Sequence, residues 1–157
     1  VGLVKGIGKC AGLDVINVKG ATGYLDTNYS GKVQAALDSL EKYDFSMIHI
    51  EAPDETGHDG DCTKKVQAIN DLDRKVINPL IKNLKKKFKE FKICIVSDHP
   101  TPIELRTHSY EYVPFMIYDS RKSISNHNQN TFNEKTVIRS DLVIEDGFTL
   151  LGRFLKD

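Results

Sequence analysis

The chain has 157 residues, the length of one ordinary domain. Its 22 basic and 22 acidic side chains give a formal net charge of zero, without the basic excess expected of a nucleic-acid or anionic-membrane surface. No stretch approaches the roughly 18 consecutive apolar residues of a membrane span. The three cysteines lack CxxC or zinc-ribbon spacing, so we expect reduced thiols and a cytoplasmic protein.

In the first third of the chain, short apolar runs alternate with a segment whose apolar residues recur at the spacing of a helix. Apolar residues recur at helical spacing between Val33 and Leu40, and Ser30 before them is the expected N-cap. The sequence predicts a helix over residues 3–10, a strand over 13–18, a turn over 20–23, a helix over 30–43 and a strand over 45–50.

The rest of the chain continues the alternation after a loop predicted over residues 51–61, which are rich in Gly, Pro and Asp. The longest predicted helix follows, with Asp61 as its cap, and Pro79 is expected to kink it or end it early. The predicted elements are this helix over residues 62–88, strands over 92–96 and 113–118, an Asn-rich surface loop over 120–133 and a helix over 147–155.

The order of these elements predicts an α/β fold with a mostly parallel sheet flanked by helices. Ligands bind such sheets outside the carboxyl ends of the strands. Asp54 and His58 follow one predicted strand, and Asp98 and His99 directly follow another. His108 lies on the next loop. We therefore expect these five side chains to converge on one edge of the sheet, whereas His49 within a strand and His127 in the Asn-rich loop are expected to be structural and solvent-exposed, respectively.

Asp and His side chains in this arrangement favour a site for divalent metal ions. They suit Zn, Mn, Co or Mg, and two such ions about 3.5–4 Å apart can clamp a phosphoryl group. Each residue alone also has an ordinary explanation, as a turn residue, a surface histidine or a strand end. Arg106 is the nearest candidate to bind a substrate carboxylate or phosphate, with a surface salt bridge as the alternative.

Several segments resemble one known family, the cofactor-independent phosphoglycerate mutases, and within it the archaeal-type branch of the alkaline phosphatase superfamily. The resemblance extends over most of the chain from Gly6 to Tyr118. The segments that carry it are GATGYLDTNYSGK at residues 20–32, EAPDETGHDGD at 51–61, SDHPTP at 97–102, LRTH at 105–108 and VPF at 113–115.

The resemblance implies two divalent ions, commonly manganese, with Mg, Co and Zn as alternatives. It implies that Asp54, His58 and His108 hold one ion and that Asp98 and His99 supply part of the shell of the other. The implied reaction interconverts 2-phosphoglycerate and 3-phosphoglycerate in glycolysis and gluconeogenesis. It passes through a phosphoserine and needs no 2,3-bisphosphoglycerate.

The family's nucleophilic serine and a further metal-binding Asp have no counterpart in this sequence, because they belong to an N-terminal segment preceding an inserted domain. Residues 1–157 are therefore expected to be the C-terminal part of an incomplete, alkaline phosphatase-like metal-binding domain, without a catalytic residue of its own and inactive alone. The alternatives are a phosphatase, a phosphopentomutase or a proposed homoserine kinase of the same superfamily, or a non-catalytic metal-binding module. The sequence leaves the oligomeric state open.

Overall fold

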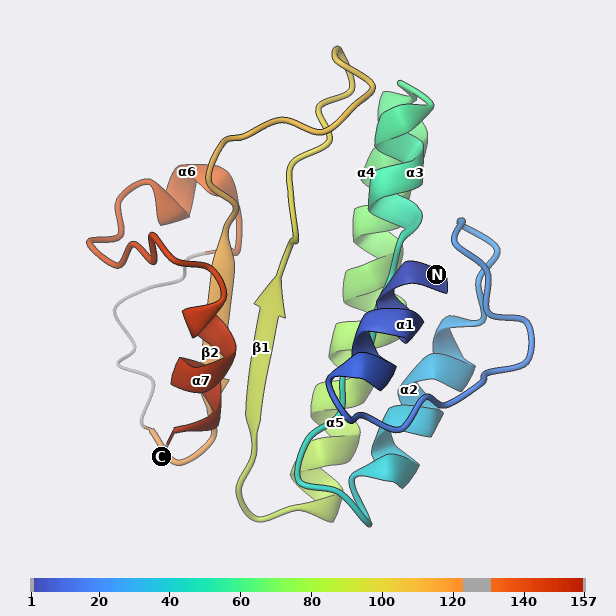
Figure 1. Cartoon of the computed structure of the whole chain (residues 1–157), viewed down its shortest axis with the longest axis vertical. Coiled ribbons are helices and arrows are strands. Elements are labelled where there is room, and N and C mark those ends of the chain that lie inside the picture. Colours follow the sequence, from blue (N-terminus) through green and yellow to red (C-terminus); the bar gives the residue numbers. More distant parts are fainter. Residues whose placement is uncertain (1, 123–130, 157) are drawn as a thin grey trace. The chain divides into compact units, whose positions relative to one another are not determined.

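The computed structural model describes residues 2–122 and 131–156, which form two compact units (Figure 1). One unit consists of Val1–Lys87 with Thr101–Ser109, and the other consists of Phe88–Pro100 with Tyr110–Asp157. No helix among the described residues is long and apolar enough to cross a membrane. The predicted loop over residues 120–133 falls largely on residues 123–130, which include His127 and lie outside the described residues.

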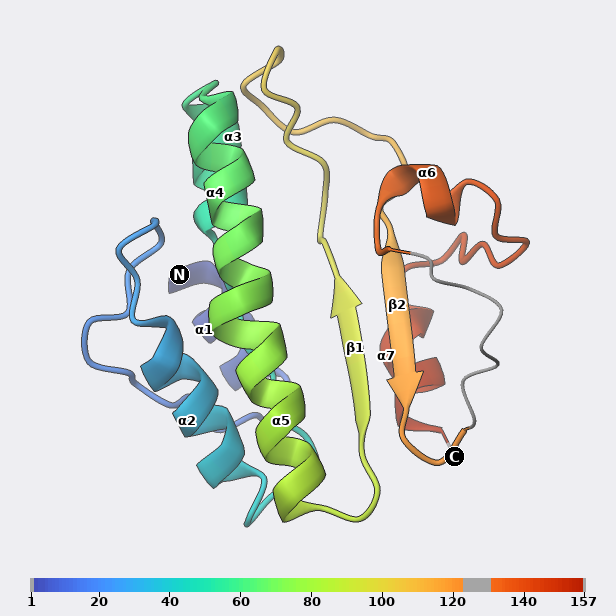
Figure 2. The ribbon, with the colours of Figure 1, turned by 180° about the vertical axis from the view of Figure 1, so that it is seen from behind.

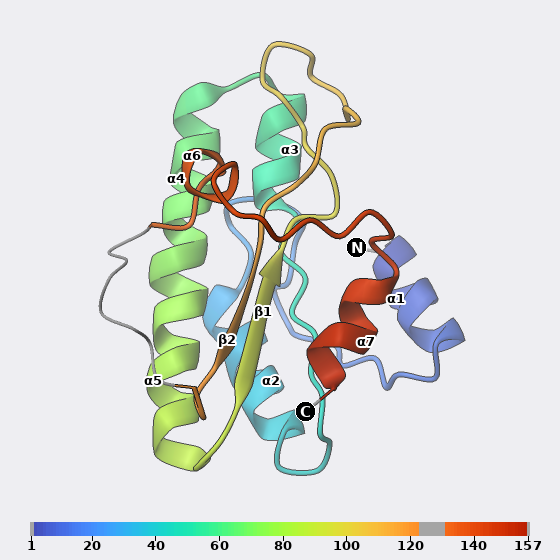
Figure 3. The ribbon, with the colours of Figure 1, turned by 90° about the vertical axis from the view of Figure 1, so that its left-hand side faces the viewer.

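The first unit is helical. Its core consists of small and apolar side chains, of which Leu37 and Ala52 are almost completely buried. Figure 3 shows α3 beside α4, the contact that places the polar side chains discussed below. The elements of this unit are α1 (Gly2–Cys10), α2 (Tyr29–Ser39), α3 (Ala52–His58), α4 (Cys62–Leu72), the π-helical turn η1 (Asp73–Ile77) and α5 (Asn78–Lys87).

The long helix predicted over residues 62–88 is confirmed as the continuous run α4–η1–α5 (Figure 2). Asp61 caps it as predicted, accepting a hydrogen bond from the Lys64 backbone N–H at 3.0 Å. Pro79 does not end the helix. The Asn78 N–H bonds to the Asp73 carbonyl five residues back, so the helix passes through a π turn just before the proline, which has no N–H to donate.

The start of α2 differs from the prediction. Asn28, not Ser30, is the N-cap, and its Oδ1 accepts from the Gly31 N–H at 2.9 Å. Ser30 lies inside the helix and donates its hydroxyl hydrogen to the same Asn28 oxygen. A Cβ on Gly31 would lie 2.4 Å from Asn28 Nδ2, so this cap requires a glycine at position 31. The helix ends at Ser39, four residues before the predicted end at Tyr43.

The predicted loop over residues 51–61 was wrong in its first part, which forms α3 (Ala52–His58). Proline is compatible with the first turn of a helix, and Pro53 lies there. The Thr56 hydroxyl donates back to the Ala52 carbonyl at 2.7 Å. Helix α3 places Asp54 and His58 one helical turn apart, on the same face.

The expected mostly parallel sheet is not present among the described residues. Their sheet has two antiparallel strands, β1 (Lys92–Val96) and β2 (Phe115–Asp119), with Lys92 opposite Asp119 and Val96 opposite Phe115. Strand β2 begins after Pro114, which cannot donate to a ladder, and hence two residues later than predicted. Residues 13–18 and 45–50, which were predicted as strands, are not strands of the sheet that the described residues form.

The second unit contains this sheet and two short helices, α6 (Glu134–Val137) and α7 (Thr149–Leu155). Helix α7 confirms the predicted terminal helix, beginning two residues later, whereas α6 was not predicted. Arg121 binds Asp119 through two hydrogen bonds of 3.0 and 2.9 Å from Nε and Nη2. These bonds hold the pKa of Asp119 well below its ordinary range.

We predict that Leu37→Ala lowers the free energy of unfolding by about 2–5 kcal/mol, since it removes a buried side chain and leaves a cavity. Urea denaturation followed by circular dichroism measures the loss. Leu3→Ala is the matched control, because Leu3 is 76% exposed and Leu37 is 2% exposed. Equal effects of the two substitutions would contradict the position of the core.

We predict that Asp119 stabilises its unit at neutral pH and that this contribution disappears in acid. Its folded pKa is depressed, so the contribution is complete above the ordinary carboxylate value of about 4 and is lost as the pH falls through the folded pKa. Urea midpoints of wild type and Asp119→Asn should therefore differ at pH 7 and converge progressively as the pH falls from about 4 through the folded pKa of Asp119. A difference that stays constant with pH would contradict this assignment.

Candidate metal centre

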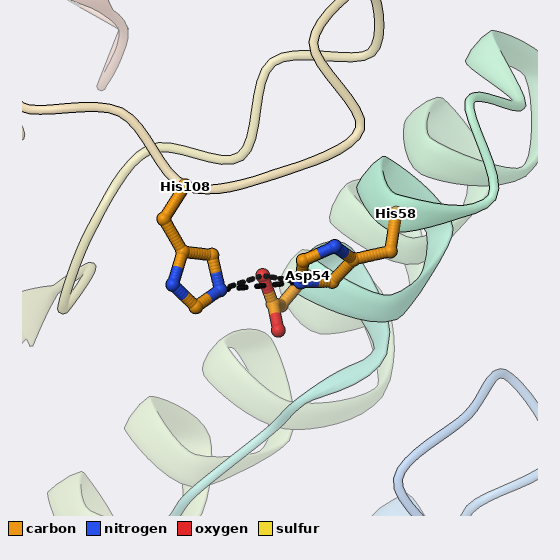
Figure 4. A group of neighbouring side chains, drawn as sticks. All are labelled: Asp54, His58 and His108. Carbon is orange, nitrogen blue, oxygen red and sulfur yellow. Dashed lines mark hydrogen bonds and ion pairs between the residues drawn. The ribbon is translucent and has the colours of Figure 1, made fainter.

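Three of the predicted metal-binding side chains lie together in the first unit (Figure 4). Asp54 and His58 project from the same face of α3, and His108 reaches them from the segment 101–109. Asp54 Oδ1 lies 3.4 Å from His58 Nε2 and 3.6 Å from His108 Nε2. The two Nε2 atoms are 3.1 Å apart. Among residues 2–122 and 131–156, this is the one group of at least three such ligand atoms found together.

This donor set fits a divalent ion. Ligand atoms about 2.0–2.1 Å from a tetrahedral zinc ion lie about 3.3–3.4 Å from one another, and the three measured separations bracket that value. One carboxylate with two imidazoles is also a mixed set of the kind that leaves further coordination positions open. The three side chains are 27–50% exposed, so substrate or water can reach the site.

Segment 101–109 is held closely against α3. The buried Thr101 donates its hydroxyl hydrogen to Asp54 Oδ1, the same oxygen that faces both histidines. The Lys65 ammonium of α4 donates to the Thr101 carbonyl at 2.5 Å. A Cβ on Gly57 would lie 2.6 Å from that carbonyl, so the glycine is what permits the close approach. Thr101, Lys65 and Gly57 thus support the site.

The same segment contacts His58 from the other side of its ring. His58 Nδ1 lies 2.9 Å from the carbonyl oxygen of Arg106. The backbone of Arg106 is left-handed, with φ of 53°. Its exposed side chain lies against Gly60, where an added Cβ would be 2.4 Å from Nε. Arg106, the predicted substrate ligand, is therefore two residues from His108 and in direct main-chain contact with His58.

Asp98 and His99 belong to the second unit, where they directly follow β1. His99 Nε2 lies 3.3 Å from Asp98 Oδ2, and the Asp98 side chain is 71% exposed. The structure therefore brings together Asp54, His58 and His108 within the first unit, and it places Asp98 and His99 beside each other within the second.

Sequence reasoning missed the residues that support the ligands. Thr101 lies in the SDHPTP motif, three residues from Asp98, but nothing in the sequence indicates that its hydroxyl meets Asp54. A second missed group follows α3, where the Tyr24 hydroxyl donates to Asp59 and Lys64 lies 3.9 Å from the same carboxylate. The hydrogen bond to Asp59 raises the pKa of Tyr24. These contacts join the loop before α2 to the loop after α3.

Comparison with known proteins places this chain in a family. The chain is 47% identical over 155 residues to a probable 2,3-bisphosphoglycerate-independent phosphoglycerate mutase of Geobacter sulfurreducens, which covers 99% of this chain and 38% of that protein. It is 43% identical over 156 residues to the 2,3-bisphosphoglycerate-independent phosphoglycerate mutase of Methanosarcina barkeri, covering 99% and 39%, respectively.

The chain is also similar to a solved structure. The PH0037 protein from Pyrococcus horikoshii matches with a TM-score of 0.71 and 36% identity, over 76% of this chain and 35% of that one. The chain spans 38–39% of the length of the two curated relatives. The metalloenzyme superfamily model matches residues 1–142, nearly the whole chain, and the chain therefore belongs to the metalloenzyme superfamily.

Proposed function

We propose that this chain is the metal-binding C-terminal part of a 2,3-bisphosphoglycerate-independent phosphoglycerate mutase. The observation that carries the proposal is the cluster of Asp54, His58 and His108, which has the composition and spacing of a divalent-metal site. Relatives that match almost the entire chain at 43–47% identity are named as such mutases. The substrate is then phosphoglycerate, and the expected setting is glycolysis in the cytoplasm.

In this proposal Asp54, His58 and His108 hold one ion, and Asp98 and His99 contribute to the shell of a second. Manganese is the first candidate, with Mg, Co and Zn as alternatives. When bound, such ions neutralise the charge of a phosphoryl group and orient it for transfer. Arg106 is exposed, its guanidinium lies against Gly60 and its main chain contacts His58, so we assign the guanidinium to the carboxylate or phosphate of the substrate.

We assign no nucleophile to the described residues. The serine that accepts the phosphoryl group is proposed to lie in a part of the complete protein outside residues 1–157. The same proposal accounts for the parallel sheet that was not found among residues 2–122 and 131–156. We propose that residues 13–18 and 45–50, whose sequences have the pattern of strands, join a mostly parallel, alkaline phosphatase-like sheet in the complete domain.

A phosphatase or another phosphotransferase of the superfamily is the main alternative. The difference depends on whether water reaches the phosphoenzyme, and the activity test below therefore separates transfer from hydrolysis. If the chain is instead a non-catalytic metal-binding module, neither transfer nor hydrolysis is expected.

We predict that His58→Ala weakens Mn²⁺ binding by the 157-residue chain at least roughly 10-fold, the effect reached even when only a partner of a ligand is removed. Asp98→Ala should leave the affinity within about 2-fold, because two protein ligands rarely hold a divalent ion firmly. Isothermal titration calorimetry measures both. His49→Ala is the control variant, because His49 lies outside the cluster. Equal losses for His58→Ala and Asp98→Ala would count against the assignment.

We predict mutase activity when this chain replaces the matching 38% of the Geobacter sulfurreducens relative. The chimera should convert 3-phosphoglycerate to 2-phosphoglycerate with Mn²⁺ present and 2,3-bisphosphoglycerate absent. His58→Ala in the chimera should abolish the conversion, because it removes a ligand.

The unmodified relative is the positive control, and circular dichroism establishes that the chimera is folded. Release of inorganic phosphate without isomerisation by the folded chimera would favour the phosphatase. Neither reaction in a folded, manganese-loaded chimera would favour the non-catalytic module.

A further inference from the structure

We propose that Arg106 is a positioning residue for His58 and that it acts through its main-chain carbonyl. The carbonyl fixes the tautomer of the His58 ring, so that the Nε2 lone pair faces Asp54 and His108. The proposal rests on the metal site proposed above and adds a residue that supports it. It is separate from the assignment of the Arg106 guanidinium to substrate.

The tautomer follows from hydrogen-bond chemistry. A carbonyl oxygen can only accept, and the Arg106 oxygen lies 2.9 Å from His58 Nδ1. The hydrogen must therefore be on Nδ1. In the neutral form of the ring, which carries a single ring hydrogen, Nε2 then has the lone pair, and that atom lies 3.4 Å from Asp54 Oδ1. Metal-binding histidines are generally held in this way, with the second nitrogen donating to a carbonyl or carboxylate.

The backbone of Arg106 supports a dedicated role. Arg106 is the one non-glycine residue with positive φ among residues 2–122 and 131–156. Side chains with a Cβ adopt this left-handed conformation at an energetic cost, and such strain is concentrated at functional sites. Both Leu105 and Arg106 donate their N–H to the Pro102 carbonyl, at 3.1 and 2.9 Å. The resulting turn presents the Arg106 carbonyl to His58.

The contact matters because the His58 side chain is 35% exposed and α3 fixes only its backbone. A half-exposed imidazole without a partner at Nδ1 can rotate and exchange tautomers. The Arg106 carbonyl removes that freedom before any ion binds. The Thr101 hydroxyl holds Asp54 in a similar way, by donating a hydrogen bond to its Oδ1. Residues 101–108 thus contact both candidate ligands of α3.

Two substitutions separate the backbone of Arg106 from its guanidinium. Arg106→Asn and Arg106→Val both remove the guanidinium, but Asn tolerates the left-handed conformation whereas a β-branched side chain does not. Their difference therefore reports the backbone. The 157-residue chain is used throughout. Long-range ¹H–¹⁵N spectra of the metal-free protein give the His58 tautomer, and titration with Co²⁺, followed by its visible absorption, gives the metal affinity without substrate.

We expect the Nδ1–H tautomer in wild type and in Arg106→Asn, with Co²⁺ affinities within about 3-fold of each other. Arg106→Val should show a mixture of tautomers and bind Co²⁺ at least roughly 10-fold more weakly. If Arg106→Val does not fold, Arg106→Ala replaces it, with a smaller loss in the same direction.

An Nε2–H tautomer in metal-free wild type would overturn the proposal. The same tautomer and affinity in Arg106→Asn and Arg106→Val would also overturn it. Failure of the metal site has a different signature: wild type would show the Nδ1–H tautomer, which supports the positioning contact, and yet would not bind Co²⁺.

Discussion

The close packing of segment 101–109 against α3 is the constraint on which the site depends. Asp54 and His58 are one helical turn apart, and they are the two candidate ligands that the short helix α3 presents on one face. The third comes from His108, fifty residues later than His58. The approach requires Gly57, because a Cβ there would lie 2.6 Å from the Thr101 carbonyl. The Lys65 ammonium then holds that carbonyl from α4.

This packing also explains how the ligands can be oriented before an ion arrives. Thr101 donates to Asp54, and the Arg106 carbonyl accepts from His58, so each ligand of α3 has a partner in the same segment. Partners of this kind set the direction of a ligand atom and contribute to metal affinity. The left-handed backbone of Arg106, which presents this carbonyl, is energetically unfavourable for a residue with a Cβ. The three side chains of the candidate site remain 27–50% exposed.

The sequence predicted which side chains lie together at the candidate site, Asp54, His58 and His108, better than the local structure around them. The long helix with its Asp61 cap also follows from a pattern that depends on few residues. The helix α3 was mistaken for a loop because Gly and Pro usually interrupt helices, whereas Pro53 occupies the first turn, where proline is favoured. Asn28 was missed as a cap because the preference among Asn and Ser is too small to choose between neighbours.

Other features could not be predicted because they depend on distant partners. A strand exists only where another strand supplies ladder hydrogen bonds, so apolar runs at 13–18 and 45–50 do not by themselves make a sheet. The left-handed turn at Arg106 is likewise held by contacts with Pro102 and His58 rather than by a favourable residue type.

The division of the chain into two units has a consequence for the two proposed metal positions. All ligands of the first position, including His108, belong to one unit, so its geometry is independent of how the units are arranged. Asp98 and His99 belong to the other unit, where they lie beside each other. Two side chains rarely hold a divalent ion firmly, so the proposed second position needs additional ligands. In the proposed mutase, the remaining part of the protein would have to supply them, and the chain alone would then bind one ion firmly and turn over no substrate.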